Sequence, residues 1–167
     1  MRGHVGLGSN EGDRLAALSA ARDALDRSPG IAVAAESSVY ETAPQGAVLD
    51  QRHFLNAVLA IDTDLAPEEL LGVCKQVERE LGRTPGGVRH GPRPIDIDLL
   101  LLSGLEHRSA RLVLPHPEVT ARRFVLEPLL ELEPELTLPD GVALAPLLHG
   151  VCDQPVKRVG PMRARTE

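Results

Sequence analysis

Two aspartates at the start of a leucine-rich run carry the clearest chemical signal in this chain. Asp96 and Asp98 flank Ile97, and Leu99–Leu102 follow directly. In a strand, alternate side chains point the same way, so the two carboxylates would share one face at a spacing of about 7 Å. Carboxylates this close repel each other and are costly to bury, whereas Mg²⁺ prefers carboxylate, water and phosphate oxygens. The pattern therefore predicts a magnesium site, or else a solvated strand end with two surface acids.

The segment just before these aspartates is basic. No acidic residue occurs between Glu80 and Asp96, although the formal net charge of the whole chain is −6. The basic residues of this segment are Arg83, Arg89, His90 and Arg93. Such a local excess of positive charge favours the binding of a polyphosphate beside a metal ion, and an ordinary solvated loop is the alternative.

Three further side chains predict a place for a flat ring. Phe54 and Asn56 fall on one face of a predicted strand, and Phe124 is the only other phenylalanine. A heterocycle could stack on Phe54, and on Phe124 if the fold brings it near, while the Asn56 amide donates to and accepts from the ring edge. The alternative is that both phenylalanines belong to the core. His116 lies between two prolines and is either a structural residue or a polar contact for a ligand.

The elements that must position these residues follow from periodicity and from capping signals. Apolar runs predict strands at residues 5–9, 31–40, 54–62, 96–102 and 112–114. Helical spacing predicts one helix from an Asp13 cap to residues 28–30, a second from Pro67 to Gly82, and a third from a Thr120 cap to a stop before Pro128.

The core order of these elements is βαββαβ. This order is typical of the ferredoxin-like α+β sandwich, a mainly antiparallel sheet with helices packed on one face. The length of 167 residues is that of one domain. We therefore expect a single domain over residues 1–150 and a loose C-terminal tail over residues 151–167.

Composition narrows the class of protein. The hydrophobic content of 43% and the charged content of 25% are typical of a globular protein. The net charge of −6 argues against nucleic acid as the main partner, and no apolar run approaches the length of a membrane span. The N-terminus lacks a signal-peptide pattern, and Cys74 and Cys152 form neither a disulfide framework nor a metal motif. The sequence has no P-loop and no dinucleotide-binding glycine motif. We expect a cytoplasmic protein.

Taken together, these motifs resemble one known family. The order and spacing of five segments are similar to those of the 6-hydroxymethyl-7,8-dihydropterin pyrophosphokinase (HPPK) family of folate biosynthesis, over residues 3 to 150. The five segments are Gly6–Asn10, Ser37–Thr42, Phe54–Asn56, Gly91–Asp98, and Leu114–Pro117 with Arg122 and Phe124. Each segment alone is a weak signal, and their combination is specific.

The resemblance implies transfer of pyrophosphate from ATP to the hydroxymethyl oxygen of the pterin, which leaves AMP. It implies two Mg²⁺ ions held by Asp96 and Asp98, and a catalytic set of Arg83, Arg93, Asp96 and Asp98. Residues implied to bind the pterin are Thr42, Ala43, Gln45, Phe54, Asn56 and Phe124. Residues implied to bind ATP are Glu78, Arg83, Arg93, Ile97, Arg111, His116 and Arg122. ATP and the pterin are then the partners, with no nucleic acid or membrane, and we expect a monomer.

The sequence departs from this family in the basic loop. Pro85 and His90 stand where some relatives have arginine and tryptophan, so we expect the loop to close over the substrates through different contacts. Ala43 and Gln45 also vary a segment that often has more proline or a bulky apolar residue.

Two alternative functions stay open at this point. A different Mg²⁺-dependent nucleotidyl or phosphoryl transferase on a similar sandwich would keep Asp96 and Asp98 but would not need Phe54, Asn56 and Phe124. A non-catalytic ligand-binding or regulatory module of the same fold class would explain the elements but not the acid pair beside a basic loop.

Overall fold

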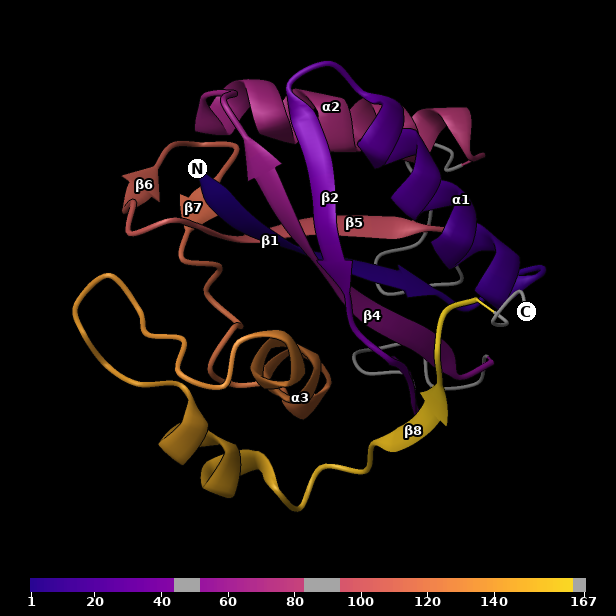
Figure 1. Ribbon diagram of the computed structural model, residues 1–167. Helices are drawn as coiled ribbons and strands as arrows, with labels where there is room; N and C mark the ends of the chain where they lie inside the picture. The colour runs from indigo at the N-terminus through magenta and orange to yellow at the C-terminus, as the bar shows by residue number, and fades with distance from the viewer. Residues whose placement is uncertain (44–51, 83–93, 164–167) are drawn as a thin grey trace.

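An antiparallel sheet forms the centre of the protein (Figure 1). The computed structural model describes residues 1–43, 52–82 and 94–163. The main strands are β1 (Arg2–Ser9), β2 (Ile31–Glu36), β3 (Val39–Thr42), β4 (Phe54–Thr63), β5 (Asp96–Leu102) and β8 (Lys157–Gly160). Their order is β5-β1-β4-β3-β8, and β2 also pairs with β4, along a different part of that strand from β3. A small hairpin joins β6 (His107–Arg108) to β7 (Val113–Leu114). The protein is therefore of the α+β class.

The first two helices begin and end where the capping signals predict. In α1 (Arg14–Arg27) the Asp13 carboxylate accepts the backbone N–H of Ala16 at 3.1 Å. In α2 (Pro67–Glu80) proline occupies the first helical position, where its missing N–H has no intrahelical partner to lose. Gly82 follows α2 with a φ of 99°, a conformation that favours glycine. Both predicted helices are confirmed.

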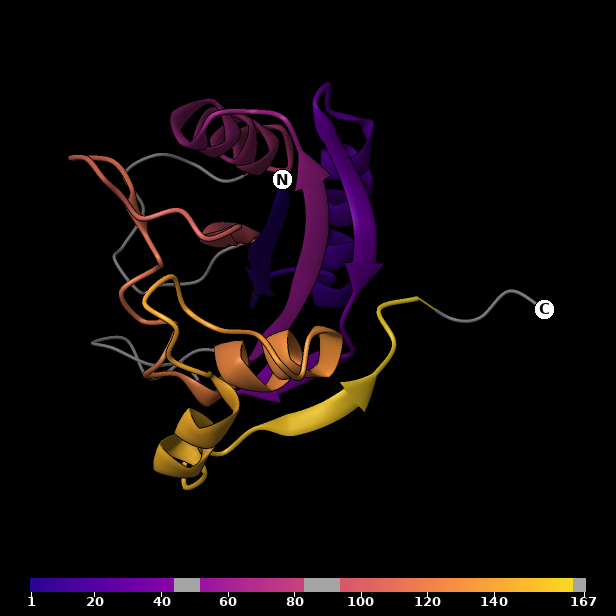
Figure 2. The same ribbon diagram turned by 60° about the vertical axis from the view of Figure 1, so that its left-hand side comes forward.

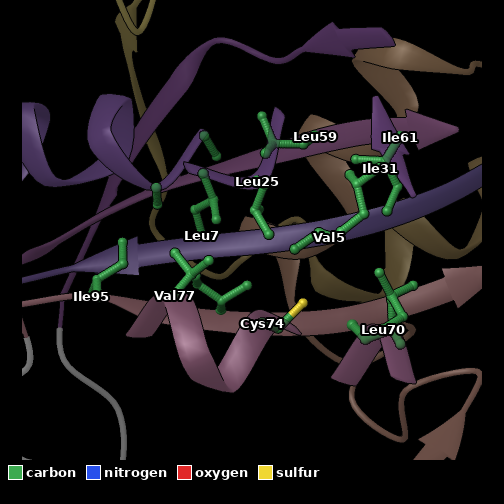
Figure 3. Packing of buried hydrophobic residues seen from close by; sticks show 14 of the residues in the cluster. Val5, Leu7, Leu25, Ile31, Leu59, Ile61, Leu70, Cys74, Val77 and Ile95 are labelled. Carbon is green, nitrogen blue, oxygen red and sulfur yellow. The ribbon is translucent and has the colours of Figure 1, made fainter. Parts of the chain in front are cut away.

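Both helices pack on one face of the sheet, and the main core lies between them and the strands (Figure 3). Alternate residues of each strand supply the apolar side chains on this face, such as Val5 and Leu7 from β1 and Leu59 from β4. Leu25 of α1 and Cys74 of α2 meet them and are fully buried. The period of two along the strands and of 3.6 along the helices thus yields one continuous apolar layer.

A third helix, which lies outside the predicted βαββαβ core, covers part of the opposite face. This helix, α3 (Arg123–Leu132), packs with the 3₁₀ helix η1 (Ala145–Val151) and with Val58 and Leu100 of the sheet. The predicted stop before Pro128 is wrong, because α3 continues through that residue. The proline removes one backbone donor, but burial of the apolar stripe around it holds the helix together.

Two other segments differ from their predictions. The single strand expected at residues 31–40 is divided into β2 and β3, which pair with different parts of β4. The segment after Gly150 is not loose in the described residues: β8 pairs with β3, and Met162 is 2% exposed in the main core. Figure 2 shows this segment passing from η1 beneath α3 to the edge of the sheet. Sequence periodicity could not detect it because a four-residue edge strand has too few apolar positions.

Within residues 1–43, 52–82 and 94–163, no helix combines the length and the apolar character needed to cross a lipid bilayer.

Candidate active site

A cavity of about 350 Å³ opens on the α3 face of the sheet. Strands β1, β4 and β5, the start of α3 and the segment around His116 contribute to its lining. Two glycines of β1 floor the cavity, and the ideal Cβ position of Gly8 lies 3.3 Å from Asn56 Oδ1 and 3.7 Å from Phe54 Cδ1. Because Gly8 has no side chain, the side chains of Asn56 and Phe54 can lie close to the β1 backbone.

Asp96 and Asp98 both line this cavity, as strand alternation predicts. Burial, together with the negative charge of Asp96, holds the pKa of the Asp98 carboxyl well above its usual range. Among the described residues no group of three or more His, Cys, Asp and Glu side chains is arranged to hold a metal ion. Two carboxylates in a cavity still match Mg²⁺, which usually takes one or two protein carboxylates and completes its shell with water and phosphate.

Basic side chains line the same cavity. Lys75 of α2 reaches it, and its Nζ lies 2.9 Å from Oε1 of the buried Glu78. Arg122, the N-cap residue of α3, lines the cavity with its guanidinium 5.6 Å from the centroid of the Phe124 ring. Sequence reasoning missed Lys75. A signal was present, because Lys75 is one of two lysines in the chain and interrupts the apolar side of α2 three residues before Glu78.

His116 is fixed in the cavity wall by two backbone contacts. The backbone N–H of His116 donates to the carbonyl of Leu100 at 2.9 Å, and the ring Nδ1 accepts the backbone N–H of Glu118 at 3.0 Å. Burial and then the charge of Arg122 lower the pKa of the His116 imidazole. Because Nδ1 accepts, the neutral ring carries its proton on Nε2 and can donate it to a ligand oxygen. Glu118 also lines the cavity and was not predicted.

The ring-binding candidates come together as the sequence predicts. Phe54, Asn56 and Phe124 all line the cavity, and both phenylalanines are only partly buried. The Asn56 Nδ2 donates to Thr42 Oγ1 at 2.9 Å and to the Tyr40 carbonyl at 3.5 Å. These bonds fix the amide orientation and leave Oδ1 to accept from an N–H of a ring. Ala43 lines the cavity as well.

Other predicted site residues are not among the described lining residues. The Ile97 side chain lies in the core on the other face, so only its backbone could approach a nucleotide. Glu78 lies behind Lys75, and the exposed Arg111 is 3.9 Å from Glu68. Gln45, Arg83, Pro85, Arg89, His90 and Arg93 lie outside the described residues.

Comparisons with known proteins connect this chain to an enzyme family. The family model described as 7,8-dihydro-6-hydroxymethylpterin-pyrophosphokinase (HPPK) matches residues 4–134. A 2-amino-4-hydroxy-6-hydroxymethyldihydropteridine pyrophosphokinase of Methylorubrum extorquens is 50% identical over 137 residues, which cover 82% of this chain and 85% of that protein. A protein of the same name from Pseudomonas aeruginosa is 40% identical, over 95% of this chain and 96% of that protein.

Longer proteins contain a similar part. The mitochondrial folate synthesis bifunctional protein of Pisum sativum is 45% identical over 77% of this chain, which corresponds to 24% of that protein. A crystal structure of Plasmodium falciparum HPPK-DHPS with pterin and p-hydroxybenzoate has a TM-score of 0.69 at 16% identity, over 89% of this chain and 41% of that one. This chain therefore spans less than half of that structure, and at such identity the likeness shows the fold alone.

Proposed function

This chain belongs to the 7,8-dihydro-6-hydroxymethylpterin-pyrophosphokinase family, and from that premise we propose that the described cavity catalyses the family's reaction. The reaction transfers pyrophosphate from ATP to the hydroxymethyl oxygen of 6-hydroxymethyl-7,8-dihydropterin. The attacking hydroxyl oxygen bonds to the β-phosphorus and its proton is released to solvent, while the bond from that phosphorus to the bridging oxygen breaks and AMP leaves with the bridging oxygen. The products are AMP and the pterin diphosphate, a step of folate biosynthesis.

One observation carries this proposal. A single cavity combines a carboxylate pair, basic side chains and a polar–aromatic set for a flat ring: Asp96 and Asp98, Lys75 and Arg122, and Asn56 with Phe54 and Phe124. A phosphoryl transferase acting on another acceptor would need the first two groups but not the third. A non-catalytic module would not need two carboxylates that repel each other in a partly buried cavity. The combination therefore favours a pterin acceptor.

Asp96 and Asp98 fit a site for Mg²⁺, and we propose two ions there. Burial and then the charge of Asp96 raise the pKa of the Asp98 carboxyl, and a bound cation would offset both effects. When bound, Mg²⁺ neutralises phosphate charge and orients the β-phosphate for attack. The protein's part is to present both carboxylates from one face of β5.

The other residues align the substrates, because this type of transfer depends mainly on positioning and charge stabilisation. The ring of the pterin stacks between Phe54 and Phe124, and Asn56 Oδ1 accepts from its edge. The Nε2–H of His116 and the guanidinium of Arg122 donate to phosphate oxygens. Since Nδ1 of His116 is engaged by a backbone donor, we assign this residue a phosphate contact and not the role of general base.

We also propose that the sheet belongs to the ferredoxin-like class. The order β5-β1-β4 followed by β2 and β3 supports the ferredoxin-like class. The predicted domain boundary at residue 150, the monomeric state and the cytoplasmic location stay predictions.

The decisive experiment measures product formation. We expect AMP and the pterin diphosphate to form in equal amounts, only when ATP, Mg²⁺ and the hydroxymethyl-dihydropterin are all present. Asp96→Ala should abolish turnover, and near-normal turnover of that variant would end the metal assignment. AMP formation that does not depend on the pterin would favour another transferase.

Ligand-induced shifts of the melting temperature, together with the product assay, distinguish the enzyme from a non-catalytic ligand-binding module. The pterin should raise the melting temperature of the wild-type protein further when an ATP analogue is present, because each ligand stabilises the folded state. Binding of the pterin without any AMP formation from ATP would favour a non-catalytic module.

A further inference from the structure

The two walls of the proposed pterin pocket come from segments far apart in the chain. Phe124 at the start of α3 forms one wall, and Phe54, Asn56 and Thr42 of β4 and β3 form the other. A flat ring between them is held only if their separation is fixed. One segment that links the walls covers residues 152–160, here called the C-terminal strap, and Figure 2 shows it running beneath α3 to the free side of β3.

Gln154 fastens one end of the strap to the turn before α3. Its Oε1 accepts the backbone N–H of Arg123 at 2.9 Å, and its Nε2 donates to the Ala121 carbonyl at 2.9 Å. In return, Arg123 Nη1 donates to the carbonyls of Cys152 at 3.0 Å and Gln154 at 2.9 Å. The N-cap residue Arg122 makes no capping bond with its side chain, so Gln154 supplies the acceptor for the first helical N–H. Gln154 thereby fixes the turn that carries Arg122.

Arg158 fastens the other end to β3. Besides the backbone pairing of β8 with β3, Arg158 Nε and Nη2 donate to Ser38 Oγ at 3.0 Å and 2.8 Å. The Ser38 N–H and the Tyr40 hydroxyl both donate to the carboxylate of Glu131 in α3, at 2.7 Å and 2.6 Å. The Tyr40 carbonyl accepts from Asn56 in the pocket. A short chain of hydrogen bonds therefore runs from the strap to the residue that orients the ring edge.

We propose that the C-terminal strap sets the separation of the two walls of the pterin pocket, with Gln154 and Arg158 as positioning residues. This inference rests on the proposed function, because it concerns the acceptor side of the same cavity. Neither side chain lines the described cavity, so each acts through its partners: Gln154 through Arg123, and Arg158 through β3. A displaced wall lowers the fraction of bound pterin that is aligned with ATP.

The first test concerns the α3 end. Gln154→Met keeps the bulk of the side chain and removes both amide hydrogen bonds. Because the turn also carries Arg122, we expect the KM values for the pterin and for ATP both to rise, by roughly three- to tenfold, the effect of about one lost hydrogen bond. The matched control is Asp153→Ala, an exposed neighbour for which the described residues show no side-chain hydrogen bond or ion pair; both KM values should be unchanged.

The second test concerns the β3 end. Arg158→Met removes the two bonds to Ser38, and we expect a rise in the KM for the pterin of roughly three- to tenfold with an unchanged KM for ATP. The matched control is Lys157→Met, which removes an exposed charge from the same strand. A general loss of stability would lower the melting temperature without separating the two KM values.

The outcomes distinguish the two proposals. If the wild-type protein forms no AMP and no pterin diphosphate, the proposed function fails before the strap is tested. If the wild-type protein is active and both methionine variants retain its KM values at a temperature well below their melting points, the strap proposal is overturned. If Gln154→Met does not fold, Arg158→Met decides alone, because a raised KM for the pterin is the result expected at both ends of the strap.

Discussion

The two faces of the central sheet differ although the same strands form both. Toward α1 and α2, alternate residues are apolar and fully packed, as Val5, Leu59 and Leu99 illustrate. Toward α3, the residues between them are small or polar at one end of the sheet, and the cavity opens there. The larger apolar core therefore lies on one face and the cavity on the other, and a strand allows this because its side chains alternate.

This difference also explains how two close carboxylates persist in a folded protein. Asp98 follows Ile97 and precedes Leu99, both of which are anchored in the main core. The core holds β5 in register, so the repulsion between Asp96 and Asp98 cannot be relieved by moving the strand. The packed face thus maintains an arrangement on the other face that would be unfavourable by itself.

The largest expected effect is on the α3 face. Asp98→Asn keeps the shape of the side chain but removes half of the proposed metal-binding charge, so kcat should fall by roughly 10²–10³-fold. Steady-state AMP formation measures this. Because the substitution also removes the repulsion with Asp96, the melting temperature should not fall; a marked decrease would mean that the charged pair stabilises the fold.

A substitution at Leu99, next to Asp98, tests the face of the sheet that packs against α1 and α2. Leu99→Ala removes a side chain that is 2% exposed in the main core and should lower the free energy of unfolding by about 2–4 kcal/mol. Urea denaturation measures the loss. Below the melting temperature kcat should match the wild-type value, and a loss of kcat comparable to that of Asp98→Asn would contradict the separation of the two faces.

A smaller effect is expected where the sheet itself forms the cavity floor. In Gly8→Ala the new methyl group would lie 3.3 Å from Asn56 Oδ1, whose amide is already held by Thr42. We expect a rise of about tenfold in the KM for the pterin, since displacing the amide costs one aligned hydrogen bond. Gly6→Ala is the comparison, because its methyl group meets Leu100 at an ordinary 3.5 Å. Equal effects of the two variants would show that crowding of Asn56 is not the cause.

The smallest effect concerns the far end of the α3 face. Burial lowers the pKa of His4, although Glu133 Oε1, 3.1 Å from its Nε2, acts in the opposite direction and Arg2 adds to the lowering. The folded protein thus binds this proton less tightly than the unfolded chain, so stability is full above the ordinary histidine pKa of about 6.5 and is lost as the pH falls below it.

His4→Gln should therefore reduce the loss of stability between pH 7 and pH 5, by no more than about 2 kcal/mol, the limit for one proton over that range. Urea denaturation at the two pH values measures it. His149→Gln, at an exposed position, is the control. An unchanged pH dependence in His4→Gln would show that the proton on His4 is not linked to folding.

Much of the site could be predicted because it depends on local spacing. The alternation around Asp96 and Asp98 and around Phe54 and Asn56 places each pair on one face in any strand. Lys75 carried a signal in its rarity and its spacing from Glu78, but whether a residue on a helix or in a loop reaches a cavity depends on the packing of its whole element, so Lys75 and Glu118 were both missed. The role of Gln154 was invisible for the same reason, since its partners lie about 30 residues earlier in the chain.

The sequence by itself determined the order of the elements from β1 to β5 except the division between β2 and β3, the ends of α1 and α2, the shared face of the two aspartates and the resemblance to the pyrophosphokinase family. These follow from periods of 2 and 3.6 residues and from side-chain chemistry, which are local properties. Only the tertiary structure decided that α3 covers the second face, that Phe124 meets Phe54 across one cavity, and that residues 157–160 close the edge of the sheet. Each of these depends on contacts between distant segments, whose free energy is gained only when the complete core has formed.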